Sequence, residues 1–340
     1  MTGHAAPLRI GVLGTGRIGR MHAELLSGRV DGAVLAGVYD TTLERAQAIA
    51  ERLGVPAASS ATELLDSSGV DAVAVCSSTE THVDAIVAAA ARGKPVFCEK
   101  PVSQDLAEVD RALAAVARAG VLLQVGFNRR FDPAHQSVRE AVVSGAVGDV
   151  HLVRISSRDP APPPLEYART SGGLFLDMTI HDFDMARYIT GSEVVEVYAQ
   201  GAVRITPELR ELGDIDTAVV TLTHAGGALS VIDNSRQAVY GYDQRVEAFG
   251  SLGMAASENP LLHTGILRTV DGAHSATLPY FFVERYIPSY VRQWDAFVAA
   301  VCNDLPSPVG GPDGRAPLAM GLAARRSLEE QRPVRLAEIG

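Results

Sequence analysis

The stretch LRIGVLGTGRIGR, residues 8–20, decides the fold of the first part of the chain. Residues 8–14 read as a short buried strand, and a helical pattern runs from about residue 17 to residue 27. The turn between them carries three glycines in the spacing G-x-G-x-x-G, namely Gly14, Gly16 and Gly19. Asp40 ends the next predicted strand, 21 positions after the last glycine. This arrangement is typical of a dinucleotide-binding unit.

The glycines predict a site for a pyrophosphate. Gly14 permits the tight turn, Gly16 lets the backbone approach the phosphates, and Gly19 lets the helix pack closely on the strand. The phosphates would sit on the N–H groups at the helix start, where Arg17 and Ile18 lie. The alternative is that the glycine turn serves packing alone.

Asp40 predicts which dinucleotide binds. Its carboxylate is expected to accept hydrogen bonds from the hydroxyls of the adenosine ribose. A 2′-phosphate would meet that negative charge, and Thr41 and Thr42 follow Asp40 where an arginine would be needed. We therefore expect NAD rather than NADP as the cofactor.

The remaining pattern predicts two domains. Up to about residue 126, apolar strands alternate with helices, which indicates a Rossmann-type, doubly wound parallel sheet covered on both faces. Between residues 193 and 282 the strands alternate polar and apolar residues, which indicates a mainly antiparallel sheet with one face on a core. We expect an NAD-binding domain over 1–126 and an α+β domain for substrate binding and oligomerisation over 127–340, whose C-terminal helices could pack back on the first. Helices of the second domain are expected at about 133–144, 173–189, 285–303 and 313–330.

Composition excludes several classes of protein. The net charge of −10 over 340 residues, with no basic block, argues against nucleic acid and against an anionic membrane surface. No apolar run approaches the ~20 residues that a membrane span needs, and no secretory signal is visible. The three cysteines, Cys76, Cys98 and Cys302, match no metal or redox spacing, so we expect buried, reduced thiols in a cytoplasmic protein.

Two further motifs lie at predicted strand ends of the first domain. VFCEKPVS places Glu99 and Lys100 at the carboxyl end of a buried strand, where ligands of open α/β sheets bind. Lys100 could instead be a surface residue paired with Glu99. CSSTETH ends the preceding strand, and its polar members are suited to the nicotinamide half of the cofactor. These are Ser77, Ser78, Thr79 and His82, although His82 could simply cap the next helix.

The stretch SGGLFLDMTIHDFDMARYITG, residues 171–191, predicts a largely apolar helix that carries Asp177, His181 and Asp184 on one face, where Tyr188 joins them. Helices that are apolar nearly all round are usually buried, and a buried charge is costly unless it is paired or lines a functional pocket. Two such residues could also bind a metal, but no third ligand has a clear spacing, so no metal is expected. Asp182 points away from the Asp177 face and is expected to be structural.

Together, the motifs GxGxxG…D, CSSTETH, EKP, GFNRRFD and GGLFLDMTIHDFD resemble the Gfo/Idh/MocA family of NAD(P)-dependent oxidoreductases over essentially the whole chain. The helix motif and YGYD (240–243) are most similar to those of its inositol-oxidising members. The resemblance implies a catalytic triad of Lys100, Asp177 and His181. It further implies an open-faced sheet that forms dimer or homotetramer contacts, and substrate contacts from three residues, Arg130, Asp159 and Tyr240.

The implied reaction is NAD-dependent oxidation of a secondary hydroxyl of a cyclitol, foremost myo-inositol to scyllo-inosose (2-keto-myo-inositol). His181 would take the hydroxyl proton, Asp177 would orient it, and Lys100 would stabilise the developing charge on oxygen. The alternatives are scyllo-inositol or a sugar pyranose such as glucose, an NAD-dependent glycosidase of the same family, and a non-catalytic sensor. Sensors tend to lose the lysine or histidine, and both are present here.

Overall fold

The structure is a computed structural model that describes residues 6–340. The chain forms two compact units, each described here by itself. One consists of the chain up to Asn128 together with Tyr290–Ala316, and the other of Arg129–Ser289 with Pro317–Gly340. The domain boundary expected between residues 126 and 127 concerns function and stays a prediction. The first unit also contains a segment from late in the chain, Tyr290–Ala316.

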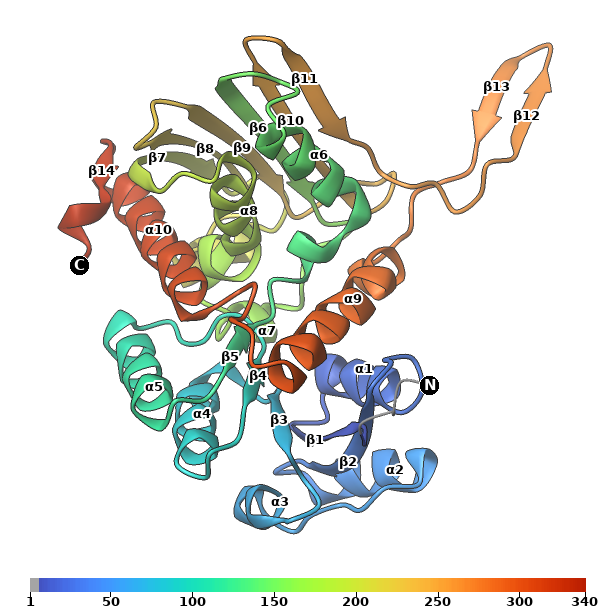
Figure 1. Cartoon of the computed structure of the whole chain (residues 1–340). Helices are drawn as coiled ribbons and strands as arrows, with labels where there is room; N and C mark the ends of the chain where they lie inside the picture. Colours follow the sequence, from blue (N-terminus) through green and yellow to red (C-terminus); the bar gives the residue numbers. More distant parts are fainter. Residues whose placement is uncertain (1–5) are drawn as a thin grey trace. The chain divides into compact units, whose positions relative to one another are not determined.

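The first unit is built on a five-stranded parallel sheet with the strand order β2-β1-β3-β4-β5, as expected for the Rossmann-type part of the chain (Figure 1). Its strands are β1 (Leu8–Leu13), β2 (Ala33–Tyr39), β3 (Ala72–Val75), β4 (Val96–Cys98) and β5 (Leu123–Val125). Its helices are α1 (Arg17–Leu26), α2 (Leu43–Leu53), α3 (Ala61–Asp66), α4 (His82–Ala90) and α5 (Leu106–Ala119). The strand order reverses between β1 and β3, and ligands of such sheets bind at this switch point, outside the carboxyl ends of the strands.

The late segment of the first unit completes its core. Helix α9 (Phe282–Cys302) contributes its residues from Tyr290 onward to this unit. The fully buried Trp294 stacks against Phe97 of β4 at 4.4 Å between ring centroids, and Phe297 packs on both rings. Aromatic burial of this kind ties the late segment to the parallel sheet.

The second unit is built on a seven-stranded sheet with the order β11-β10-β6-β9-β8-β7-β14. The strands are β6 (Val150–Arg158), β7 (Val194–Ala202), β8 (Thr217–His224), β9 (Leu229–Ser235), β10 (Asp243–Gly250), β11 (Gly253–Ser257) and β14 (Val334–Arg335). All neighbours pair antiparallel except β6 and β9, which are parallel. The sheet is therefore mainly antiparallel, as predicted.

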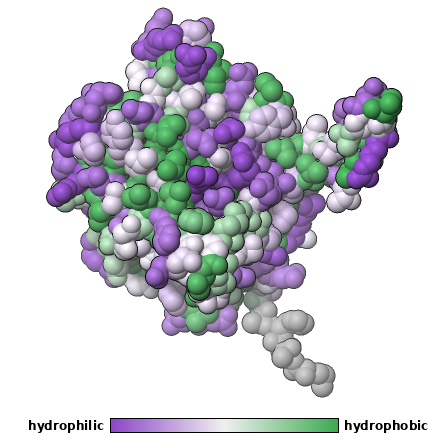
Figure 2. Space-filling view, turned by 90° about the horizontal axis from the view of Figure 1, so that it is seen from above, coloured by the Kyte–Doolittle hydropathy of each residue, from purple (hydrophilic) through white to green (hydrophobic). Residues whose placement is uncertain are grey.

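Helices cover one face of this sheet and leave the other face open (Figure 1). The helices of this unit are α6 (Pro133–Val143), α7 (Leu165–Ala168), α8 (Ile180–Thr190), the part of α9 up to Ser289 and the part of α10 (Gly311–Glu330) from Pro317. Short 3₁₀ segments lie at Pro207–Leu212 and Leu336–Glu338, and a third, Asn128–Phe131, begins at the last residue of the first unit and continues into this one. A hairpin of β12 (Ile266–Thr269) and β13 (Gly272–Ser275) projects from the unit, at the right of Figure 2, and all its strand residues are exposed.

The helix expected over 173–189 differs from the prediction in one respect. Residues Phe175–Thr179 form a π-helical turn, and only Ile180–Thr190 form a regular α-helix. A π turn takes one residue more than an α turn and is frequent at functional sites. Side-chain periodicity did not reveal it, because apolar residues on nearly every side of this helix leave its phase undefined.

The cysteines differ from the expectation in a similar way. Cys76 and Cys98 are buried, and burial raises the pKa of both thiols well above the usual value. Cys302 is exposed, contrary to the expectation of three buried thiols, because it ends α9 at the protein surface.

Candidate active site

The three glycines of the first turn have different steric surroundings. Gly14 has a positive φ of 92°, and a Cβ added there would lie 2.5 Å from the Cα of Ser77. A Cβ at Gly19 would lie 1.8 Å from the Gly14 carbonyl oxygen. Gly16 has negative φ, and a Cβ there would have no atom within 4 Å. The fold therefore requires Gly14 and Gly19, whereas no contact within the protein accounts for Gly16. The open space at Gly16, at the start of α1, fits a pyrophosphate that approaches the backbone.

Asp40 is anchored beside this turn with acceptor capacity left over. Its carboxylate accepts hydrogen bonds from the Thr15 N–H at 2.6 Å, the Thr15 hydroxyl at 3.0 Å and the Thr42 N–H at 2.9 Å. Burial raises the pKa of Asp40, but these hydrogen bonds outweigh it and hold the pKa below the usual value. An ionised carboxylate has about four acceptor positions, so a ribose hydroxyl can still be accepted.

Glu99, next to Lys100, is held by a buried chain of hydrogen bonds. The Trp294 indole N–H donates to Nδ1 of His22 at 2.9 Å, and Nε2 of His22 lies 2.8 Å from Oε1 of Glu99. An indole can only donate, so the proton of neutral His22 lies on Nε2 and is donated to Glu99. The other oxygen of Glu99 accepts from the Lys100 N–H at 3.3 Å. The sequence offered no signal that joins residues so far apart in the chain.

His82 joins the two loops that follow β3 and β4. Its ring is buried, with Nδ1 2.9 Å from the Pro101 carbonyl and Nε2 3.1 Å from the Ser77 carbonyl. Burial lowers the pKa of His82, although the two carbonyls oppose this effect. Thr79 is partly exposed and Ser78 exposed, so both remain available to a ligand.

In the second unit, the helix described above presents two polar residues. Across residues 174–186, all described by the structure, every side chain is buried except Asp177 and His181. Asp177 accepts hydrogen bonds from the Tyr167 hydroxyl and from Nη2 of Arg236, both at 2.8 Å. Within residues 174–186, the two accessible side chains are therefore those that the resemblance assigns to catalysis.

Arg236 contacts both a predicted substrate residue and a predicted catalytic residue. Its second terminal nitrogen, Nη1, donates to Asp159 at 3.1 Å, so one guanidinium contacts both Asp159 and Asp177. Burial raises the pKa of Asp159, and the neighbouring Asp177 raises it further, while Arg236 opposes both effects. The sequence analysis missed Arg236, although an arginine near the end of a strand-like run was a usable signal.

Arg130 lies in a different network. Its guanidinium donates to both carboxylate oxygens of Asp184, at 2.8 Å and 2.6 Å, and both side chains are buried. It also lies over the ring of Tyr188, 5.3 Å from the centroid. Asp184 thus neutralises Arg130, and a substrate contact of Arg130 remains a prediction.

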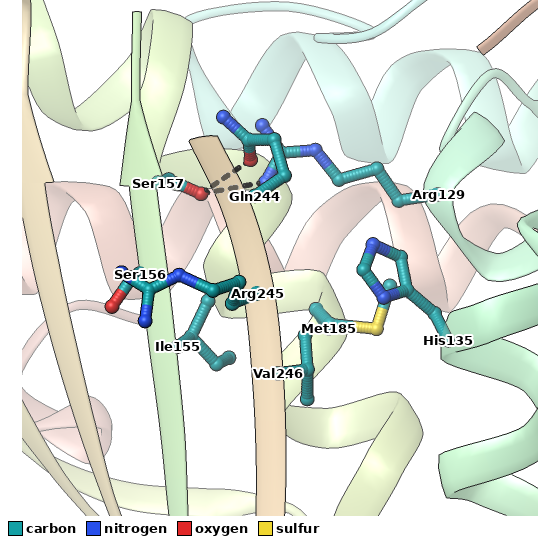
Figure 3. Close-up of a pocket in the computed structure, with 9 residues that line it drawn as sticks. All are labelled: Arg129, His135, Ile155, Ser156, Ser157, Met185, Gln244, Arg245 and Val246. Atoms are coloured by element: carbon teal, nitrogen blue, oxygen red, sulfur yellow. Dashed lines mark hydrogen bonds between the residues drawn. The ribbon is translucent and has the colours of Figure 1, made fainter. Parts of the chain in front are cut away.

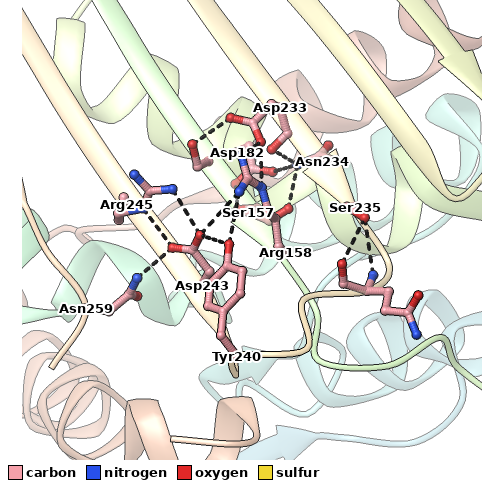
Figure 4. A network of polar contacts seen from close by, with 12 residues as sticks. Ser157, Arg158, Asp182, Asp233, Asn234, Ser235, Tyr240, Asp243, Arg245 and Asn259 are labelled. Carbon is pink, nitrogen blue, oxygen red and sulfur yellow. Dashed lines mark hydrogen bonds and ion pairs between the residues drawn. The ribbon is translucent and has the colours of Figure 1, made fainter. Parts of the chain in front are cut away.

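Asp182 has the structural role that its position suggested. It is fully buried and pairs with Arg129 at 2.6 Å. It also accepts a hydrogen bond from Asn234 at 2.8 Å (Figure 4). Beside this network lies a narrow gap, lined among others by Ser157 and Gln244 (Figure 3). The gap has no room for a water molecule, and none of the predicted site residues lines it.

Tyr240 lies in a more exposed part of the polar network that Figure 4 shows. Its hydroxyl donates to Asp243 at 2.7 Å and accepts from Arg158 at 3.0 Å, and 48% of the residue is exposed. Burial and the hydrogen bond to Asp243 raise the pKa of Tyr240. The exposed ring leaves a substrate contact possible in steric terms.

The predicted residues thus form two groups. Those assigned to the cofactor, together with Lys100, belong to the first unit, and those assigned to the substrate, together with Asp177 and His181, belong to the second. Within residues 6–340, no group of three or more His, Cys, Asp or Glu side chains is arranged to hold a metal ion. In the same part of the chain, no helix is long and apolar enough to span a membrane.

A parallel sheet with a strand-order switch point, a glycine turn with open space at its helix start and an anchored acid after the second strand are the features of a dinucleotide-binding fold. Residues 8–127 match the family described as "Oxidoreductase family, NAD-binding Rossmann fold", and residues 135–256 match the "GFO/IDH/MocA C-terminal domain". The chain therefore belongs to the Gfo/Idh/MocA family and is an NAD-dependent oxidoreductase.

Three known proteins show how close the similarity is. The chain is 50% identical to the myo-inositol 2-dehydrogenase of Thermotoga maritima, over 98% of this chain and 99% of that protein. It is 43% identical to the inositol 2-dehydrogenase of Rhizobium meliloti, over 97% and 99%. The crystal structure of scyllo-inositol dehydrogenase from Lactobacillus casei with bound NAD(H) and scyllo-inositol is 28% identical, has a TM-score of 0.91 and covers 97% of this chain and 99% of that one.

Proposed function

We propose that this protein oxidises a secondary hydroxyl of a cyclitol with NAD, and that its substrate is myo-inositol, which becomes scyllo-inosose. The observation that carries the proposal is the pair Asp177 and His181, the two side chains left accessible on an otherwise buried helical stretch. The names of the relatives from Thermotoga maritima and Rhizobium meliloti support this substrate.

In this proposal His181 is the base that removes the hydroxyl proton, since a histidine has a pKa near ~6.5 and can accept a proton at neutral pH. Asp177, held by Tyr167 and Arg236, would orient the ring of His181 and stabilise its protonated form. Lys100 would donate a hydrogen bond to the same substrate oxygen as negative charge develops there.

The residues that would hold NAD all belong to the first unit. The helix start at Gly16, Arg17 and Ile18 would bind the pyrophosphate, and Asp40 the adenosine ribose. The polar loops after β3 and β4 would surround the nicotinamide through Ser77, Ser78, Thr79, His82, Glu99 and Lys100. When bound, NAD supplies the acceptor for the hydride that leaves the substrate carbon.

The remaining substrate hydroxyls would be bound by Asp159, Arg130 and Tyr240, because a polyol satisfies polar groups that would otherwise stay unpaired. scyllo-Inositol is the second candidate, and the NAD-bound scyllo-inositol dehydrogenase structure favours it. A sugar pyranose and a glycosidic bond are the other substrates to test.

We further propose that the enzyme is a cytoplasmic homo-oligomer that pairs through the open face of the seven-stranded sheet. Leu229, Phe249 and Met254 lie in one cross-strand row on that face and are each about half exposed. Such a row on a sheet face suits contact with a second copy. Phe249→Glu should lower the molar mass measured by sedimentation equilibrium, and an unchanged mass would refute this interface.

The enzymatic proposal is tested by measuring NADH formation with NAD and four substrates, namely myo-inositol, scyllo-inositol, D-chiro-inositol and glucose. We expect the highest kcat/KM with myo-inositol. Lys100→Ala or His181→Ala should lower kcat by about 100- to 10,000-fold while NADH binding stays nearly intact. Near-normal turnover of either variant would contradict the roles. Cleavage of an aryl glycoside without net NADH would instead identify a glycosidase.

A further inference from the structure

Arg236 occupies an unusual position between two carboxylates. Its side chain is only 6% exposed, yet it contacts Asp159 at 3.1 Å and Asp177 at 2.8 Å, whose side chains are 24% and 11% exposed. The arginine is thus buried behind two carboxylates that are themselves partly accessible. A ligand in this part of the second unit would meet the carboxylates and not the guanidinium.

The sheet itself fixes this arrangement. β6 and β9 are the parallel pair of the sheet, and Arg158 is in register with Ser235, so Asp159 and Arg236 are the next residues on neighbouring strands. The Asp159 N–H donates to the Ser235 carbonyl at 2.9 Å, and the Arg236 N–H donates to the Asp216 carbonyl at 2.9 Å. The backbone of both partners is therefore held by hydrogen bonds and does not depend on a loose loop.

One acceptor of this cluster remains unused. Among residues 6–340, the one side-chain hydrogen bond to the Asp159 carboxylate is the bond that Oδ2 accepts from Arg236, and Oδ1 accepts none from these residues. An ionised carboxylate oxygen can only accept hydrogen bonds. The cluster therefore offers an acceptor to a donor from outside.

We propose that Arg236 is a specificity-determining positioning residue, which keeps Asp159 and Asp177 ionised and at a fixed spacing so that they accept hydrogen bonds from neighbouring ring hydroxyls. This inference rests on the proposed function, since it assigns the residue that selects a polyol at the same site. Without the guanidinium, two close carboxylates repel each other, and one of them binds a proton and becomes a donor. The site would then accept ligands in which a hydroxyl is blocked or replaced by an acceptor.

Other charged and titratable groups near the pair include His181, which lies four residues after Asp177 on the same helical stretch. Tyr167 donates to Asp177 from α7, and Arg129 and Tyr242 interact electrostatically with Asp159. Arg129 is already paired with Asp182. Arg236 is therefore the one cation that contacts both carboxylates among residues 6–340.

The test compares Arg236→Gln and Arg236→Lys with wild type, using myo-inositol and a mono-O-methyl inositol. Arg236→Gln should lower kcat/KM for myo-inositol by about 100-fold or more, because it removes the partner of a charged pair. The acid limb of its kcat/KM profile should move to higher pH by about one unit or more, since an opposite charge has been lost. Discrimination against the methylated ring should shrink by about tenfold or more. Arg236→Lys should restore the wild-type acid limb of the kcat/KM profile, because lysine provides the positive charge. It should not restore the selectivity against the methylated ring, because lysine lacks the two donor nitrogens with which the guanidinium contacts both carboxylates.

The matched control is Arg187→Gln, which removes an arginine of the same unit that pairs with Glu193. It should leave kcat/KM, its pH profile and the discrimination unchanged. If wild type oxidises myo-inositol but Arg236→Gln keeps the wild-type pH limb and discrimination, the role of Arg236 is refuted and the proposed function stands. A fold defect alone would lower Tm without moving the pH limb, and that outcome also refutes it. If wild type oxidises none of the polyols, both proposals fall together.

Discussion

The Trp294 indole donates a hydrogen bond to His22 Nδ1 at 2.9 Å, and this contact joins residues 272 positions apart. It fixes which nitrogen of His22 carries the proton and hence how Glu99, the neighbour of Lys100, is held. A residue of the late chain segment thus orients the loop that follows β4. Neither end of this contact is exposed to solvent.

Trp294→Phe should therefore lower the free energy of unfolding by about 1–3 kcal/mol more than the removal of buried apolar area by itself would do. The additional loss arises because Nδ1 of His22 is left as a buried acceptor without a hydrogen bond. The measurement is urea denaturation. Phe297→Leu is the control, since it removes apolar volume from the same aromatic cluster without touching a hydrogen bond. Equal losses in the two variants would show that the His22 contact contributes nothing.

The glycine turn gives a sharper contrast. Gly16→Ala should fold with a Tm close to wild type, because a Cβ there meets no protein atom, but it should bind NADH at least about tenfold more weakly, or ~1.4 kcal/mol. Gly19→Ala should lose stability outright, because its Cβ would overlap the Gly14 carbonyl. Thermal melts and fluorescence titration with NADH separate the two effects. Unimpaired NADH binding by Gly16→Ala would contradict the phosphate site.

Asp40 should set cofactor choice. Asp40→Ser removes the charge that repels a 2′-phosphate, so the ratio of kcat/KM with NAD to that with NADP should fall by about tenfold or more. Asp71→Ser, which removes a carboxylate paired with Arg9 elsewhere in the first unit, should leave this ratio unchanged. Selectivity that survives Asp40→Ser would mean that another residue reads the ribose.

His135 should make the protein sensitive to acid. Burial lowers the pKa of His135 to about 4, against ~6.5 in an unfolded chain, so protons bind preferentially to the unfolded state. The free energy of unfolding should be highest above pH ~6.5. It should fall as the pH drops toward 4, and at pH 5 the loss due to His135 should be about 2 kcal/mol. In His135→Gln the difference in unfolding free energy between pH 7 and pH 5 should shrink by that amount. The exposed His151→Gln is the control, and an equal pH dependence in all three proteins would rule out His135 as the cause.

The fold followed from the sequence to a large extent, because the alternation of strands and helices and the polar–apolar alternation after residue 193 are local patterns. The Rossmann-type sheet and the mainly antiparallel sheet were both predicted and are both present. The spacing of the glycines also predicted which of them are required for steric reasons, since Gly14 and Gly19 lie where a Cβ atom would clash with other atoms.

The polar clusters of the site could not be predicted in the same way. The contact of Arg236 with Asp159 depends on the parallel register of β6 and β9, which no local pattern reveals. The chain from Trp294 through His22 to Glu99 depends on packing between distant segments. Such contacts are set by the tertiary structure, whereas periodicity reports only on neighbours along the chain.

The π turn at Phe175–Thr179 has a consequence for how this helix can vary. Each residue of an α-helix advances the side chains by about 100° around the helix axis. One extra residue in the π turn therefore rotates the segment before the turn by about that angle relative to the α-helix that follows it. Deleting a single residue here would restore an ordinary α-helix and rotate the segment that carries Tyr167 away from Asp177. The orientation of this polar cluster is thus encoded in the length of one turn as well as in the identity of its side chains.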